Sequence, residues 1–178
     1  MGGGTDKQNR DVMMVQPTAI KVQQVIEMNA VRCQICGSLR RGRPVVGDVD
    51  MVVSDVKKAL GVAQAWAETR SREFVIRTKE IKKSGSALIE GIQFDMYEAS
   101  EDQWGAMTMF LTGSANFNIA MRMHAKKLHL KLNQYGVWKG EDLIAARTEE
   151  LIFDSLGMRH YKPEERDFER GTRIDIVV

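Results

Sequence analysis

One short segment, GDVDMVVSD at residues 47–55, constrains the fold more than any other part of the chain. Its polar and apolar residues alternate, which is typical of a β-strand with one buried face. Side chains two apart on a strand point the same way, so Asp48 and Asp50 lie on one face, roughly 7 Å apart at Cα. The intervening apolar residues predict a covered face on the other side. A strand with a solvent-facing acidic edge would produce the same pattern.

A second alternating segment, IQFDMYE at residues 92–98, carries a third carboxylate. Asp95 lies on the face opposite Ile92, Phe94 and Met96. If this strand lies beside the first, three carboxylates meet at one site, an arrangement that suits Mg²⁺ ions bound through substrate phosphates. Asp95 could then also accept a proton from an attacking hydroxyl. Asp175, in RIDIVV, has a similar local pattern, but it lies at the C-terminal end and is ranked below Asp95.

A candidate phosphate-binding loop precedes the carboxylates. Gly37-Ser38 follows a predicted strand and precedes a predicted short helix through Arg41, which Ser38 could cap. Backbone N–H groups at such a junction favour anions, and an arginine can hold phosphate oxygens with two donors. The GDVD motif follows this loop, and together the two features are a strong signal for phosphoryl transfer.

The remaining pattern predicts an α+β protein. Apolar periodicity and breakers predict a mixed sheet with flanking helices, followed by a small α+β C-terminal subdomain. The predicted domains are a flexible N-terminus at 1–12, the mixed-sheet domain at 13–105 and the C-terminal subdomain at 106–178. Predicted helices cover 17–29, 55–69 with Ser54 as its cap, about 101–109, 114–127 and 148–156. Predicted strands cover 30–36, two segments within 73–98 and the alternating LHLKLNQYGVW.

Charge and cysteine content bear on the protein's partners and on its cellular compartment. Lys and Arg number 26 against 24 Asp and Glu, so the net charge of +2 is no nucleic-acid signature by itself. The basic residues nevertheless cluster, within 40–43, 77–83 and 122–131, although each cluster also fits an ordinary solvated surface. Cys33 and Cys36 have too few companions for a zinc site and are interpreted as structural. Low cysteine use, no signal sequence and no long apolar run predict a soluble intracellular protein.

In five segments, taken in order, the chain resembles the family X DNA polymerases, the DNA polymerase β-like group. The resemblance covers residues 30–167, and residues 131–144 resemble the compact, virus-encoded members most. The segments are GSLRRGRPVVGDVD, IQFDMY, FLTGSANFNIAMRMHA, LNQYGVW and IFDSLGMRHYKPEERD.

The resemblance implies a DNA-directed DNA polymerase that adds dNMP to a DNA 3′-OH, in gap-filling or base excision repair. It implies that residues 13–105 form a nucleotidyltransferase palm and residues 106–178 a nucleotide- and template-binding subdomain. It implies two Mg²⁺ ions per active site, which Mn²⁺ can replace, DNA and dNTP as partners, and a monomer with no membrane association, in the host-cell cytoplasm or virion if virus-encoded. The implied metal ligands and catalytic residues are Asp48, Asp50 and Asp95. The implied nucleotide contacts are Gly37, Ser38, Arg41, Gly47, Thr112, Gly113, Ser114 and Asn118. The expected DNA contacts are Arg122, Asn133 and Tyr135 from the resemblance, and Lys126, Lys127 and Lys131 from the basic cluster beside them.

Three departures from the family pattern bear on selectivity. Gln93 stands where many members have a basic residue, Phe110-Leu111 replaces a more usual Tyr-Phe pair, and Ala115 replaces a residue that often contacts the incoming base. No segment resembles the family's lyase domain or helix-hairpin-helix motif, so weak, strongly salt-dependent DNA binding is expected. A template-independent terminal transferase, an RNA-directed nucleotidyltransferase and a non-catalytic nucleic-acid-binding module are the alternatives.

Overall fold

The computed structural model describes residues 8–176, and its chain divides into two compact units. The first unit comprises residues up to Ile35 together with Arg43–Glu98, and the second comprises Cys36–Gly42 and the chain from Ala99 onward. The division therefore falls after Glu98, somewhat before the predicted boundary at 105, and the 37–42 loop groups with the C-terminal residues. Residues 1–7 of the predicted flexible N-terminus lie outside the described residues. Helix and strand together confirm the predicted α+β class.

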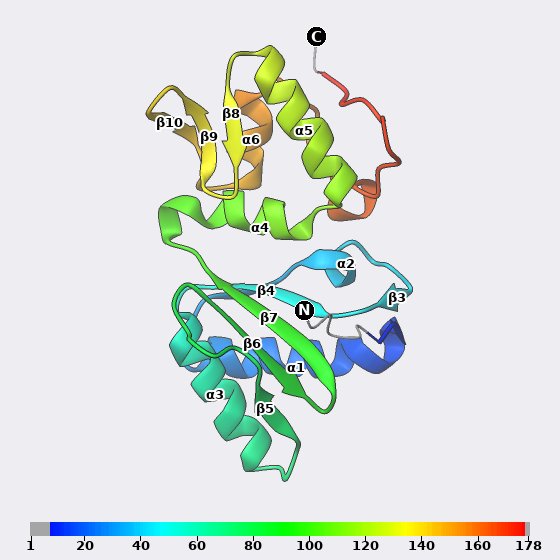
Figure 1. The fold of residues 1–178 in the computed structure, drawn as a ribbon, viewed down its shortest axis with the longest axis vertical. Helices are drawn as coiled ribbons and strands as arrows, with labels where there is room; N and C mark the ends of the chain where they lie inside the picture. Colours follow the sequence, from blue (N-terminus) through cyan, green and yellow to red (C-terminus); the bar gives the residue numbers. More distant parts are fainter. Residues whose placement is uncertain (1–7, 177–178) are drawn as a thin grey trace. The chain divides into compact units, whose positions relative to one another are not determined.

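The first unit is built on a five-stranded mixed sheet of order β2-β4-β7-β6-β5 (Figure 1). Only β4 and β7 pair in parallel; the other neighbours are antiparallel. A separate two-stranded ribbon joins β1 (Arg10–Asp11) and β3 (Val45–Val46). The sheet strands are β2 (Cys33–Ile35), β4 (Val49–Val53), β5 (Phe74–Ile76), β6 (Ser84–Ile89) and β7 (Ile92–Glu98).

Helices α1 (Val12–Met28) and α3 (Val56–Glu68) cover one face of this sheet (Figure 1). Phe94 and Met96 of β7 are fully buried on that side. A Cβ added to Gly85 of β6 would lie 2.5 Å from Leu60 of α3, so β6 and α3 pack closely. Alternation then sends Gln93 and Asp95 to the opposite face.

Several predicted boundaries of the first unit were wrong by a few residues because capping decides where a helix starts. Helix α1 begins at Val12 rather than 17, since the Asp11 carboxylate accepts a hydrogen bond from the Met13 amide and Pro17 is tolerated inside the helix. Asp55, not Ser54, caps α3 through the Lys58 amide. Asp48 immediately precedes β4, which starts at Val49.

The second unit packs helices against a small antiparallel sheet of order β10-β9-β8 (Figure 1). Its core is a cluster of buried apolar side chains centred on Phe117, whose ring makes edge-on contacts with Phe153, Tyr161 and Phe168. Such aromatic pairs stabilise beyond their buried area. The elements are α2 (Gly37–Arg40), η1 (Glu101–Gln103), α4 (Trp104–Thr112), α5 (Ala115–Lys127), β8 (Lys131–Asn133), β9 (Gly136–Lys139), β10 (Asp142–Ala145), α6 (Glu149–Ser155) and η2 (Pro163–Glu165).

Candidate active site

Three carboxylates meet on the face of the sheet opposite the helices: Asp50 on β4, Asp48 just before β4, and Asp95 on the neighbouring strand β7. One ligand oxygen from each of Asp48, Asp50 and Asp95 lies within 4.8 Å of the others, and all three residues are half-buried. The parallel pairing of β4 and β7 causes this meeting, because it places Asp50 and Asp95 directly opposite each other in register. The predicted juxtaposition of the three side chains is therefore present.

Carboxylates this close repel each other, and a bound cation removes that repulsion. Oxygen ligands of this kind are the ones that hard divalent cations such as Mg²⁺ prefer. The donor set of Asp48, Asp50 and Asp95 thus fits a divalent metal. Gly47, also half-buried, lies in the turn that leads into Asp48.

Gln93 lies beside the third aspartate and contacts it directly. Its Nε2 donates hydrogen bonds to both carboxylate oxygens of Asp95, at 3.1 and 2.9 Å. The two residues are two positions apart on β7 and therefore share a face. A neutral amide orients Asp95 here without the positive charge that a basic residue would bring, so Gln93 is a positioning residue that the charge pattern of the sequence did not reveal.

Of the predicted triphosphate contacts, Gly37, Ser38 and Arg41 belong to the second unit, whereas Gly47 belongs to the first. Gly37 has a φ of +63°, a conformation that favours glycine, and begins α2. Ser38 lies inside α2 and does not cap it; Cys36 holds the cap position, without a side-chain hydrogen bond. The Arg41 guanidinium donates to the Thr112 carbonyl and, through Nε, to Asp167 at 2.8 Å. Asp167 thus occupies a donor that a phosphate would also use.

The T-G-S segment joins α4 to α5 next to Arg41 within this unit. The Thr112 hydroxyl donates to the Thr108 carbonyl and accepts from Arg40, both at 2.7 Å. The Ser114 hydroxyl accepts from the Phe117 amide at 3.3 Å, so Ser114 caps α5 rather than beginning it as predicted. It also donates to the Arg166 carbonyl at 2.7 Å. Gly113 has a φ of +64° between them.

The predicted base and template contacts gather around α5 and β8. Asn118, Arg122 and Asn133 line one small depression together with Phe110. The Asn118 amide donates to the Phe110 carbonyl at 2.7 Å, and the Asn133 side chain accepts from the Tyr135 amide at 2.9 Å, so both side chains are held in place. The remaining predicted DNA contacts are exposed: Lys126, Lys127, Lys131 and Tyr135.

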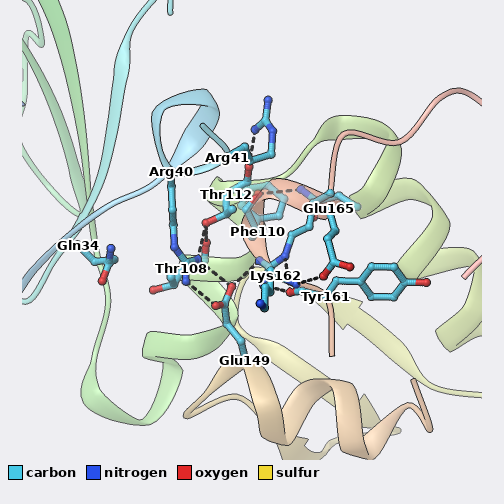
Figure 2. A network of polar contacts seen from close by, with 12 residues as sticks. Gln34, Arg40, Arg41, Thr108, Phe110, Thr112, Glu149, Tyr161, Lys162 and Glu165 are labelled. Atoms are coloured by element: carbon cyan, nitrogen blue, oxygen red, sulfur yellow. Dashed lines mark hydrogen bonds and ion pairs between the residues drawn. The ribbon is translucent and has the colours of Figure 1, made fainter. Parts of the chain in front are cut away.

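A buried ion network, which the sequence did not reveal, holds the phosphate loop within the second unit (Figure 2). Glu149, at the start of α6, accepts from Arg40 at 3.0 and 2.7 Å and from Arg166 at 2.6 Å. Arg166 is 1% exposed and also donates twice to the Tyr161 carbonyl. Glu149 therefore ties the loop helix α2 to the C-terminal residues of the chain.

Ion pairing, rather than burial, sets the direction in which the pKa values of Glu149 and Arg40 shift. Burial raises the pKa of Glu149, but hydrogen bonds from Arg40 and Arg166 and their charges bring the pKa below its ordinary value. Burial lowers the pKa of Arg40, but Glu149 outweighs it and leaves that pKa raised. In the sequence Arg40 was only one member of a basic cluster, and no motif singled out Glu149.

The first unit carries three clustered carboxylates on the sheet face opposite its helices, and the second unit carries a glycine-serine loop and an arginine. These features are typical of a metal-dependent phosphoryl-transfer class of protein. Comparison with family models gives the family. Residues 10–127 match the DNA polymerase beta palm and residues 107–167 match the DNA polymerase beta thumb. The chain therefore belongs to the DNA polymerase β family, family X, whose members are metal-dependent nucleotidyltransferases.

Individual relatives agree with this assignment. The chain is 26% identical over 150 residues to the repair DNA polymerase X of African swine fever virus, covering 80% of this chain and 86% of the viral protein. It is 24% identical over 189 residues to DNA polymerase lambda of Rattus norvegicus, covering 87% of this chain and 33% of that protein. A shorter match, 30% over 77 residues, links it to DNA polymerase IV of Saccharomyces cerevisiae.

Within residues 8–176 no helix is long and apolar enough to cross a membrane. The metal-ligand, nucleotide and DNA-contact roles of the individual residues stay predictions. The carboxylates lie in the first unit and Gly37, Ser38 and Arg41 in the second, so their joint action on one substrate is also a prediction.

Proposed function

We propose that this protein is a template-directed DNA polymerase that adds a deoxynucleoside monophosphate to a DNA 3′-OH, and that it fills gaps during repair. The observation that carries the proposal is the meeting of Asp48, Asp50 and Asp95 within 4.8 Å in a chain of family X. The relatives named above as a repair polymerase X and a polymerase lambda support the repair role.

Asp48, Asp50 and Asp95 would hold two Mg²⁺ ions. When bound, a pair of such ions lowers the cost of charge on both the attacking and the leaving oxygen of phosphoryl transfer. Asp95 would in addition accept the proton of the primer 3′-OH. Gln93, through its two hydrogen bonds, fixes the direction in which the Asp95 carboxylate points.

The triphosphate would contact Gly37, Ser38, Arg41 and Gly47. Arg41 suits this role because a guanidinium binds phosphate oxygens with two donors. It would exchange its present partner Asp167 for a phosphate oxygen. Anchoring by Arg40 and Glu149 keeps this loop in one conformation, which reduces the ordering cost when the nucleotide arrives.

The sugar and base would lie along α5, with Thr112, Gly113 and Ser114 at the sugar and Asn118 at the base. The half-exposed ring of Phe110 lines the same depression as Asn118 and Arg122, and it offers an apolar face where a base could stack. DNA would contact the exposed Lys126, Lys127 and Lys131, with Arg122, Asn133 and Tyr135 towards the template. The protein would act as a monomer.

Single-nucleotide incorporation tests the proposal. The protein is mixed with gapped, nicked, blunt or single-stranded DNA and each dNTP or rNTP separately, with Mg²⁺ or Mn²⁺. The proposal expects incorporation of the complementary dNTP only, fastest on the gapped substrate, and none by Asp48→Ala/Asp50→Ala. Addition of every nucleotide without a template would show a terminal transferase, and extension of RNA only would show an RNA-directed enzyme. DNA binding without incorporation would show a non-catalytic module.

A further inference from the structure

A second surface of the first unit, unrelated to the carboxylates, has the character of a docking site. Helices α1 and α3 pack side by side, and a groove of about 680 Å³ runs between their outer sides. The carboxylates lie on the other face of the sheet that these helices cover, so neither nucleotide nor metal binding at Asp48, Asp50 and Asp95 accounts for this groove.

The floor of the groove is apolar. Val25 from α1 and Val62 from α3 are half-buried there, and the buried Trp66 of α3 also lines the groove. Met28 stands at the edge with 85% of its surface exposed. An exposed concavity lined by apolar groups is a favourable binding site, because covering it with another apolar surface removes both surfaces from water.

The walls of the groove are positively charged. Lys21, Lys58 and Arg70 line it, and among the described residues of the lining there is no acid. Three acids of the two helices hydrogen-bond within their own helix or its cap. Gln23 donates to Glu27 at 3.0 Å, Gln64 donates to Glu68 at 2.8 Å, and Asp55 accepts from the Lys58 amide. This positive charge is a local concentration, because the whole chain carries a net charge of only +2.

Gly61 lines the middle of the groove and lies inside α3. Glycine is unfavourable at an exposed position within a helix. A Cβ added there would meet nothing within 4 Å, so packing within the described chain does not require a glycine. Because no large side chain stands at this position, the groove stays open along α3.

From these observations we propose that the groove between α1 and α3 binds an acidic amphipathic helix of a partner protein. Such a helix would place apolar residues spaced i, i+3, i+4 and i+7 on the valine floor and its carboxylates against the lysines and arginine. The 13 residues of α3 give the groove a length of roughly 20 Å, which accommodates about four turns. A nucleic acid would satisfy the cations but would leave the apolar floor uncovered, so a peptide fits better.

A helical-peptide display library tests this proposal. Its 15-residue peptides carry apolar residues at i, i+3, i+4 and i+7 and random residues elsewhere, and selection uses the full chain. The leading peptide is then synthesised and titrated by fluorescence anisotropy. The proposal expects enrichment of acidic sequences and at least tenfold weaker binding to two variants, Gly61→Leu, which fills the groove, and Lys58→Glu, which reverses a wall charge.

Two matched variants make the result specific. Gly61→Ala adds only a Cβ to the same position, and Lys57→Glu reverses the exposed charge next to Lys58, outside the residues that line the groove. Both should bind the peptide within twofold of the wild type, and all four variants should keep wild-type primer extension. No enrichment, enrichment of neutral or basic peptides, or equal affinity for Gly61→Leu would overturn the proposal. Loss of DNA affinity in Gly61→Leu, with no peptide binding, would assign the groove to nucleic acid and also overturn it.

Discussion

Glu149→Gln removes one negative charge from the centre of the buried network while it keeps the side-chain shape. In the wild-type protein the Glu149 carboxylate accepts three hydrogen bonds from two guanidinium groups, and its side chain is 12% exposed. The substitution leaves Arg166, whose side chain is 2% exposed, without a counter-charge.

The magnitude follows from the burial of that arginine. Removing one partner of a buried ion pair costs about 3–5 kcal/mol, because the other charge stays desolvated. Arg166 keeps its hydrogen bonds to the Tyr161 carbonyl and its positions over Phe117 and Phe153, at 5.5 and 5.3 Å, so the lower end of this range applies. A loss of about 3 kcal/mol lowers the Tm by roughly 6–12 °C in a protein of this size.

Thermal unfolding followed by circular dichroism, together with urea unfolding, measures this loss. Glu150→Gln is the matched control, because it removes an exposed carboxylate from the same first turn of α6. Both variants lose the favourable effect of an acid at a helix start, so their difference reports the pairing with Arg40 and Arg166. The control should stay within about 0.5 kcal/mol of the wild type. Equal stabilities of the two variants would refute the role assigned to the network.

Three further predictions concern pH, glycine packing and the third aspartate. The folded-state pKa of Glu149 is lowered, so the ionised carboxylate stabilises the fold fully above the ordinary glutamate pKa of about 4.3, and this contribution is lost as the pH falls through the lower folded value. The difference in unfolding free energy between wild type and Glu149→Gln, measured by urea unfolding, should therefore be constant from about pH 7 to 5 and shrink below about pH 4. Gly105→Ala should lower the free energy of unfolding, because the added Cβ would lie 2.3 Å from the Thr148 backbone. Gly61→Ala should raise it by up to about 1 kcal/mol, because the added Cβ meets nothing. Changes of the same sign in both variants, measured by urea unfolding, would contradict the packing described. Gln93→Ala should weaken Mn²⁺ binding by roughly 10-fold or more in calorimetric titration, because partners that orient a ligand commonly contribute that much, and unchanged affinity relative to a Gln64→Ala control would exclude the positioning role.

The strands that carry the carboxylates were predictable from the sequence because their alternation is regular. Period-two patterning put Asp50 and Asp95 on the faces opposite their apolar neighbours, and the structure confirms both placements. The pairing itself was a hypothesis, since nothing local in a strand specifies its neighbour. Helix α5 was predicted at 114–127 and runs over Ala115–Lys127, because Ser114 is its cap rather than its first residue.

Interactions between residues far apart in the chain could not be predicted from the sequence. Arg40 and Glu149 are 109 positions apart, and each has the composition of an ordinary surface residue. Arg166 lies in a charged C-terminal segment, a composition typical of exposed surface, yet aromatic rings of the second unit bury it. Gln93 was noted only as a departure from a family pattern, and its hydrogen bonds to Asp95 depend on a side-chain geometry that no periodicity encodes.

The most direct test of the metal site is a Mn²⁺ titration of the full chain, followed by electron paramagnetic resonance, with a non-reactive dNTP analogue present. The wild-type protein should bind two Mn²⁺ ions per chain. Asp50→Asn and Asp95→Asn, which keep the side-chain size, should each lose at least one ion or bind it at least tenfold more weakly, whereas the exposed Asp175→Asn should match the wild type. Two ions bound with unchanged affinity by Asp50→Asn and Asp95→Asn would contradict the account.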